Sequence, residues 1–170
     1  SFIVAMKDIP EVWEISYKNQ FKPHESTVPA LITQPAGHGT ELEIPLRRML
    51  LDQTLDDFFF NSTYKNLVGS SREGKGVVLD LDQGKALKQI ALAGMPHLGS
   101  GIEWKYKNRP VLATPSLQEG SISIIDTQNW DVFKKIETSG PGSFCEVMTT
   151  LPMRGLGSLW VPKKMRCTSS

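Results

Sequence analysis

The sequence predicts an all-β protein that forms part of a β-propeller, about two to three blades long. Three observations lead to this fold class. The middle of the chain repeats itself at a constant spacing, short runs of β-branched residues end in polar turns, and the 170 residues include 14 glycines and 11 prolines. A repeat of about 40 to 50 residues built from such strands is typical of four-stranded propeller blades.

The repeat emerges when the chain is shifted by 46 residues against itself, so that Gly74 falls on Gly120. The other matched pairs are Asp80 with Asp126, Lys88 with Lys134, Ile90 with Ile136 and Gly94 with Gly140. Turn residues and apolar residues stay in phase together, which indicates a repeated structural unit.

Two strands precede the repeats, over residues 2–6 and 11–17. The stretch from residue 21 to residue 45 is polar and is interrupted by four prolines. Because proline removes a backbone donor, we expect this stretch to be a long loop between blades.

Each repeat contains an apolar segment with small residues, over 65–71 and 109–115, which we expect to be the inner strand of its blade. A hairpin follows in each repeat, with strands over 76–80 and 86–90 in the first and over 121–126 and 132–136 in the second. The residues between the two strands of each hairpin are polar, as a turn requires.

The charge of the chain excludes some classes of partner. Lys and Arg number 19 against 18 for Asp and Glu, which gives a net charge of +1 at pH 7. A nearly neutral protein has little attraction for nucleic acid or anionic membranes, and no apolar run approaches the roughly 20 residues that span a bilayer.

The chain begins at Ser1 inside a predicted strand, so we expect it to be a piece of a longer protein.

The two cysteines, Cys145 and Cys167, lack the spacing of a zinc ribbon or of a c-type haem attachment site. Two separate thiols are favoured over one disulfide.

Five segments carry a resemblance to a known family: 55–60, 69–76, 94–101, 119–126 and 139–142. In this order and spacing they resemble the haem d1 propeller family, which includes the cytochrome cd1 nitrite reductases and proteins that help to mature the haem d1 cofactor. The resemblance implies an eight-bladed propeller with haem d1 in its axial cavity, of which this chain is a fragment.

The resemblance also implies roles for individual residues. His97, in a Pro-His-x-Gly loop, takes the place of a catalytic histidine above the iron, where nitrite binds. The residues expected to contact haem d1 are Arg72, Gly99, Ser100, Trp104 and Phe144. No residue of this chain is expected to bind a metal, because the proximal histidine of the iron is expected upstream of Ser1.

Some positions depart from the family pattern. A second distal histidine is expected near Leu55, but Asp56 and Asp57 stand there instead. They are predicted to relay protons in its place, or alternatively to be solvated carboxylates of a turn. The arginine that the family has after the histidine loop is Ser100 here. Considered without the resemblance, His97 is an ordinary loop histidine and Arg72 is a surface charge.

The resemblance divides the chain in two. Residues 1–144 are predicted to be a partial haem d1 propeller domain, whereas residues 145–170 lack strand alternation and match nothing in the family. A single-nucleotide frameshift near the codon for Ser143 is our hypothesis for this tail.

The function that the resemblance implies is that of a haem d1 domain from a dissimilatory nitrite reductase, which forms nitric oxide from nitrite. A haem c domain is expected upstream, with a small cytochrome c or cupredoxin as electron donor, a periplasmic location and a homodimeric complete protein. The fragment alone is expected to be inactive. The alternative is a haem d1 biosynthesis or maturation protein of the same fold, and a third reading is an interaction propeller that binds no haem.

Overall fold

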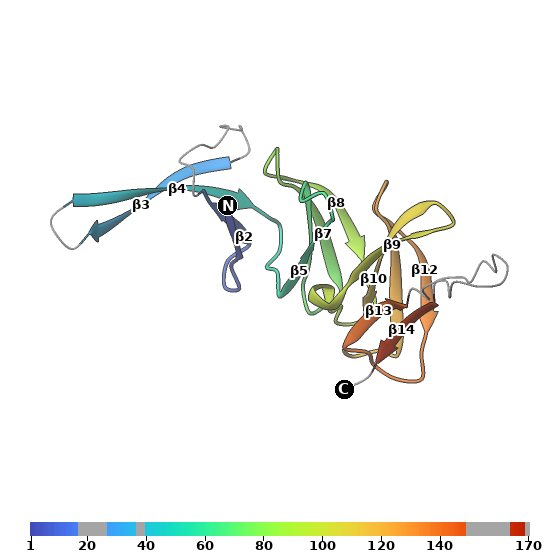
Figure 1. The fold of residues 1–170 in the computed structure, drawn as a ribbon. Coiled ribbons are helices and arrows are strands. Elements are labelled where there is room, and N and C mark those ends of the chain that lie inside the picture. Colours follow the sequence, from blue (N-terminus) through green and yellow to red (C-terminus); the bar gives the residue numbers. More distant parts are fainter. Residues whose placement is uncertain (17–26, 37–39, 149–163, 169–170) are drawn as a thin grey trace. The chain divides into compact units, whose positions relative to one another are not determined.

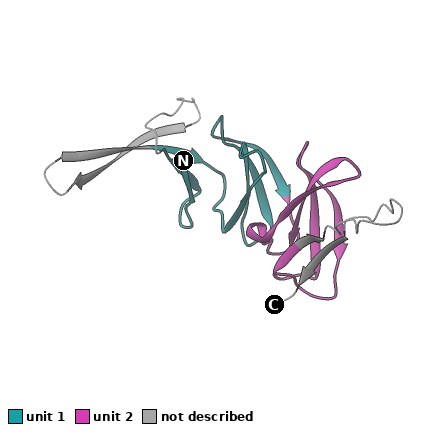
Figure 2. Cartoon of the chain, in the orientation of Figure 1, with its two compact units in different colours: residues 1–90 teal, residues 91–170 magenta. Residues whose placement is uncertain are grey.

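The protein consists of antiparallel β-sheets (Figure 1), as predicted. The computed structural model describes residues 1–16, 27–36, 40–148 and 164–168. Over these residues it contains three four-stranded sheets, one two-stranded sheet and a single short 3₁₀ helix. No helix in the described ranges has the length and apolar character needed to cross a membrane. The chain divides into two compact units, residues 1–90 and 91–170 (Figure 2), and each is considered separately.

The first sheet of unit 1 has the order β1-β2-β4-β3. Its strands are β1 (Phe2–Ala5), β2 (Glu11–Ile15), β3 (Thr27–Ala36) and β4 (Thr40–Leu50). β3 and β4 correct the prediction of a loop for the described part of residues 21–45, whereas residues 21–26 and 37–39 lie outside the described ranges. Pro29 and Pro35 are tolerated because β3 is an edge strand. Pro45 is tolerated because β4 pairs with β2 only from Leu46 onward, so that at Pro45 it has a single neighbour.

The second sheet of unit 1 has the order β5-β6-β7-β8. Its strands are β5 (Asp57–Phe60), β6 (Asn66–Ser70), β7 (Lys75–Asp80) and β8 (Lys85–Ala91). A buried apolar cluster joins the two sheets of the unit: Val12 and Met49 come from the first sheet, and Leu67, Val77 and Leu79 from the second.

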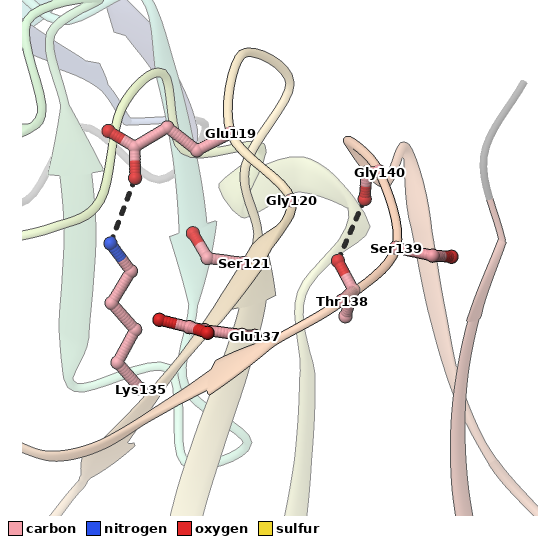
Figure 3. A pocket seen from close by; sticks show the side chains of 8 residues that line it. All are labelled: Glu119, Gly120, Ser121, Lys135, Glu137, Thr138, Ser139 and Gly140. Carbon is pink, nitrogen blue, oxygen red and sulfur yellow. Dashed lines mark hydrogen bonds and ion pairs between the residues drawn. The ribbon is translucent and has the colours of Figure 1, made fainter.

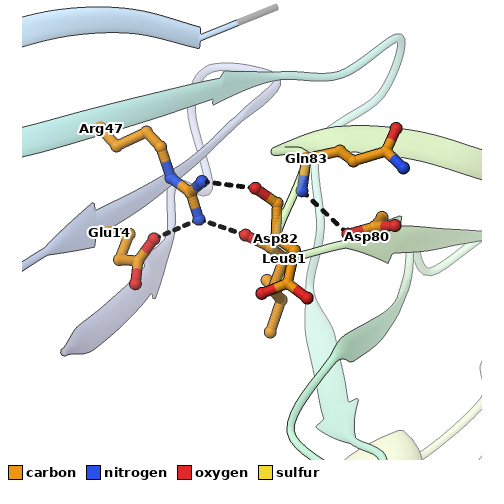
Figure 4. Close-up of polar contacts among 6 residues, drawn as sticks. All are labelled: Glu14, Arg47, Asp80, Leu81, Asp82 and Gln83. Atoms are coloured by element: carbon orange, nitrogen blue, oxygen red, sulfur yellow. Dashed lines mark hydrogen bonds and ion pairs between the residues drawn. The ribbon is translucent and has the colours of Figure 1, made fainter. Parts of the chain in front are cut away.

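A buried arginine also joins the two sheets of unit 1 (Figure 4). Arg47 of β4, whose side chain is 8% exposed, forms an ion pair with Glu14 of β2. The same guanidinium donates to the carbonyl oxygens of Leu81 and Asp82, in the turn between β7 and β8. Because the Arg47 side chain is buried with its carboxylate partner and two carbonyls, it fixes this turn to the first sheet.

Unit 2 contains a sheet of the order β12-β11-β10-β9. Its strands are β9 (Ile102–Tyr106), β10 (Arg109–Pro115), β11 (Ser121–Asp126) and β12 (Asp131–Glu137). The predicted repeat is visible in the strand bounds, since β11 and β12 begin and end 46 residues after β7 and β8. The segments predicted as inner strands, 65–71 and 109–115, are the second strands of their sheets, because β5 and β9 precede them.

The repeated hairpin turn tolerates two different residues in one unusual conformation. Gly84 has a φ of +68°, and Trp130, at the equivalent position 46 residues later, has a φ of +60°. Each donates its backbone N–H to the backbone carbonyl of the aspartate that ends the preceding strand, Asp80 or Asp126, over 2.7 Å. The side chain of Trp130 is buried, and this burial offsets the strain of a left-handed backbone in a residue other than glycine.

The C-terminal segment differs from the prediction of a tail without strands. It contains β13 (Phe144–Met148) and β14 (Lys164–Thr168), paired antiparallel, while residues 149–163 and 169–170 lie outside the described ranges. Cys145 is buried and disulfide-bonded, which corrects the prediction of two thiols, and Cys167, the other cysteine, is its Cα partner in the register. Whether the tail arises from a frameshift stays a prediction.

Candidate functional site

The loop that carries His97 is held against the end of β10. The His97 N–H donates to the carbonyl of Pro115 over 2.9 Å, and the Leu117 N–H donates to the carbonyl of Met95 over 2.8 Å. Gly94, with a φ of +52°, permits the turn into this loop, and a Cβ there would lie 2.6 Å from the Ser116 hydroxyl. The loop sequence therefore folds into one defined arrangement, with His97 immediately before the 3₁₀ helix η1 (Leu98–Ser100).

The imidazole of His97 is half-buried and has one ring nitrogen engaged. Its Nδ1 lies 2.8 Å from the carbonyl oxygen of Ser143. A carbonyl oxygen only accepts, so Nδ1 carries the hydrogen, and the neutral ring presents the lone pair of Nε2. That lone pair can accept a proton or coordinate a metal such as haem iron.

The other predicted residues of unit 2 have different environments. Ser100 donates its backbone N–H to the His97 carbonyl over 3.2 Å, and Gly99 is exposed beside it. Trp104, in β9, is half-buried and packs against the apolar cluster that includes Val111 and Ile124. Phe144 is 51% exposed and follows Ser143, the residue that accepts the His97 hydrogen bond. No observation on this structure tests their contacts with a cofactor, so those contacts stay predictions.

In unit 1 the structure brings Asp56 and Arg72 together. The Asp56 carboxylate accepts from the Arg72 backbone N–H and from its Nε, each over 3.0 Å. The side chain of Arg72 is 67% exposed, and its two terminal nitrogens take no part in these bonds. Asp57 stands apart from this pair, at the start of β5, where its carboxylate accepts from the Phe58 N–H over 2.9 Å.

Two serines beside Arg72 were missed by the sequence analysis. Ser70 is 1% exposed and Ser71 is half-buried, yet the hydroxyl oxygen of each is buried without a hydrogen-bond partner among the described residues. The Ser-Ser-Arg run at the end of β6 was the available signal, but only its arginine was considered.

The donor types at this end of β6 are suited to the carboxylates of haem d1. Hydroxyls left unpaired in a protein interior are costly unless a ligand or water satisfies them. The guanidinium of Arg72, which follows the two serines in the chain, is by its chemistry a donor to an anionic group. His97 supplies, in unit 2, a nitrogen lone pair of the kind that chemistry at a tetrapyrrole requires.

A family model described as "Cytochrome D1 heme domain" matches residues 1–161 of this chain. Among curated proteins, the dihydro-heme d1 dehydrogenase of Pseudomonas aeruginosa is 43% identical over 145 residues, which are 85% of this chain and 25% of that protein. The chain therefore spans about a quarter of the length of this relative.

Among solved structures, the dihydro-heme d1 dehydrogenase NirN in complex with DHE matches with a TM-score of 0.64 and 39% identity, over 88% of this chain and 28% of that one. The prediction of a partial all-β propeller is thereby confirmed. The hydrazine synthase of Kuenenia stuttgartiensis is less similar, with 17% identity and a TM-score of 0.48, over 85% of this chain and 38% of that one.

The prediction of a nitrite reductase is wrong. The relative that is 43% identical to this chain over 145 residues is a dehydrogenase of dihydro-haem d1, so the likeness lies with the biosynthesis of the cofactor. The sequence departures already pointed this way, since aspartates replace the second distal histidine. The alternative prediction, a maturation protein of the same fold, is the better supported one.

Proposed function

Because this chain belongs to the family of cytochrome d1 haem domains, we propose that it forms part of a protein that binds dihydro-haem d1 and dehydrogenates it to haem d1. The identity of 43% to a dihydro-heme d1 dehydrogenase supports this substrate. The observation on the structure that carries the proposal is the hydrogen bond from His97 Nδ1 to the Ser143 carbonyl, because it leaves Nε2 as a base.

Dehydrogenation removes two electrons and two protons from the substrate. His97, in the tautomer fixed by Ser143, is suited to take one of these protons at Nε2, and the other passes to solvent water. In unit 1, Arg72 is a donor suited to a carboxylate of a tetrapyrrole, because Asp56 holds its Nε and leaves its terminal nitrogens for an anion. In this proposal His97, which was expected above the iron where nitrite binds, accepts a proton from the tetrapyrrole, and Asp56 positions Arg72.

The two electrons pass to an acceptor outside this chain. The haem c domain that we expected upstream is a suitable first acceptor, and a small soluble redox protein would then take electrons away rather than deliver them. We also propose that the complete protein lies in the periplasm and forms a homodimer.

The test is a conversion assay with the complete natural protein, an electron acceptor and dihydro-haem d1, followed by visible absorption. We expect the spectrum of dihydro-haem d1 to be replaced by that of haem d1, and we expect the His97→Ala variant to bind the substrate without converting it. A wild-type protein that binds the tetrapyrrole and leaves it unchanged would contradict the dehydrogenase proposal.

A further inference from the structure

A polar pocket of about 340 Å³ lies in unit 2, between the β10–β11 turn and the end of β12 (Figure 3). Its lining residues are Glu119, Gly120, Ser121, Lys135, Glu137, Thr138, Ser139 and Gly140. Its volume is at the lower end of the range for small-ligand sites, which run from about 300 to 1,000 Å³. None of these residues has a part in the proposed dehydrogenation.

Two polar groups of the pocket are left without partners. Ser121 is 2% exposed, and its hydroxyl is buried with no hydrogen bond among the described residues. Figure 3 shows this side chain between the Glu119–Lys135 ion pair and Glu137. The Glu137 carboxylate, on the strand position directly opposite Ser121, likewise forms no ion pair or hydrogen bond within the part of the chain that the structure describes.

The blade architecture does not require these groups. The repeat places Lys75, Gln89 and Ala91 of unit 1 at the positions of Ser121, Lys135 and Glu137. The same pair of strands is therefore formed elsewhere in this chain without a buried hydroxyl or a second carboxylate. An unsatisfied buried hydroxyl destabilises the fold. Because only the second repeat has such a hydroxyl at the position of Ser121, its presence there indicates a ligand.

The charges determine the class of that ligand. Lys135 neutralises Glu119 over 2.9 Å, which leaves the carboxylate of Glu137 and a hydroxyl that can accept. A ligand group that donates hydrogen bonds and carries a single positive charge complements the Glu137 carboxylate and the Ser121 hydroxyl. A divalent metal ion is disfavoured by the ammonium of Lys135, and no group of three metal-ligating side chains occurs in the described ranges. We propose that this pocket binds a guanidinium or primary ammonium group, which pairs with Glu137, hydrogen-bonds to Ser121 and competes with Lys135 for Glu119.

The direct test is a titration of the protein with N-acetylargininamide, observed at the amide resonances of Gly120 and Gly140 in glycine-labelled protein. We expect saturable shifts that weaken as salt is added, and no shifts with the uncharged glutamine analogue. Glu137→Gln is expected to weaken binding about tenfold or more, whereas Glu73→Gln, on the equivalent turn of unit 1, leaves it unchanged. Absence of saturation, or equal binding by Glu137→Gln, would overturn the proposal.

Two further variants separate this proposal from a structural role of the pocket. Ser121→Ala should weaken binding while Tm stays the same or rises, because the hydroxyl has no partner to lose. Lys135→Met should bind the probe more tightly, since it releases Glu119. Loss of probe binding in Lys135→Met would refute the assignment, because removal of a competing ammonium should not weaken the binding of a cation.

A peptide with one arginine among neutral residues distinguishes the two sources of such a group. Tighter binding of the peptide than of N-acetylargininamide supports a basic side chain of another protein, and equal affinities support a small amine or guanidine.

Discussion

Asp56 holds Arg72 by two hydrogen bonds of 3.0 Å, one to the backbone nitrogen and one to Nε. This geometry fixes the base of the guanidinium and leaves its two terminal nitrogens for a second anion. We propose that Asp56 positions Arg72 in this way, while the proton relay expected from the sequence stays a prediction.

Replacing Asp56 with Asn should weaken the binding of haem d1 several-fold and change stability by no more than about 1 kcal/mol, because the pair is largely exposed. Titration of the complete protein with haem d1, followed by visible absorption, measures the first effect. Asp52→Asn, a change of an exposed aspartate that accepts from Gln89, is the matched control. Equal haem affinity of the Asp56 and Asp52 variants would remove the positioning role.

Replacing His97 with Ala should lower the rate of dehydrogenation by about 100-fold or more, because general-base catalysis contributes a factor of this size. The affinity for the tetrapyrrole should change little. Added imidazole should restore part of the rate if Nε2 acts as a base. A variant that loses tetrapyrrole binding as well, and that imidazole does not rescue, would identify His97 as a residue for binding alone.

Replacing Arg47 with Ala should destabilise the protein by about 3 kcal/mol, because it leaves the buried Leu81 carbonyl and the largely buried Glu14 carboxylate without their donor. Chemical denaturation provides the measurement. Lys75→Ala, which removes an exposed lysine paired with the exposed Glu73, should cost no more than about 1 kcal/mol. Similar losses in the two variants would argue against a special role for Arg47.

Replacing Gly84 with Ala should cost about 1 kcal/mol, because the backbone of this residue has a φ of +68°. Gly140→Ala serves as the control, since nothing lies within 4 Å of the added Cβ. Thermal unfolding should show a lower Tm for the first variant only, and an unchanged Tm of Gly84→Ala would indicate that the turn has another conformation.

The stability contributed by Glu11 should depend on pH. The hydrogen bonds from Arg48 and then Trp13 hold the pKa of the Glu11 carboxyl below its ordinary value of 4.5. A group whose folded pKa is lowered stabilises the fold fully above its ordinary value, and this contribution is lost as the pH falls through the folded pKa. The Tm difference between wild type and Glu11→Gln should therefore be constant near neutral pH and shrink below about pH 4.5. A difference that does not vary with pH would contradict this account.

The repeat could be predicted because each residue that defines it has a local cause. Asp80 and Asp126 end their strands and accept from the backbone of the turn, at Gln83 and Gln128, so the same residue type recurs at the same place. Local signals of this kind are visible in a sequence.

Other features depend on neighbours that are distant in the sequence. In the sequence, the prolines of β3 and β4 indicate a loop. A strand is possible because β3 lies at a sheet edge and β4 has one neighbour at Pro45, and neither fact is visible in the sequence. The contact of Asp56 with Arg72 crosses 16 residues, and that of His97 with Ser143 crosses 46. The orphaned hydroxyls of Ser70 and Ser121 are recognisable only once burial is known, because serine is common in turns and strands alike.

The central claim is that His97, with Nδ1 bound to the Ser143 carbonyl, takes a proton from dihydro-haem d1. The most direct measurement is a single-turnover absorption experiment on the complete natural protein loaded with dihydro-haem d1, mixed with an electron acceptor, for the wild type and His97→Ala. We expect conversion to haem d1 in the wild type and a bound, unconverted substrate in the variant. Equal rates of conversion in the two proteins would contradict it.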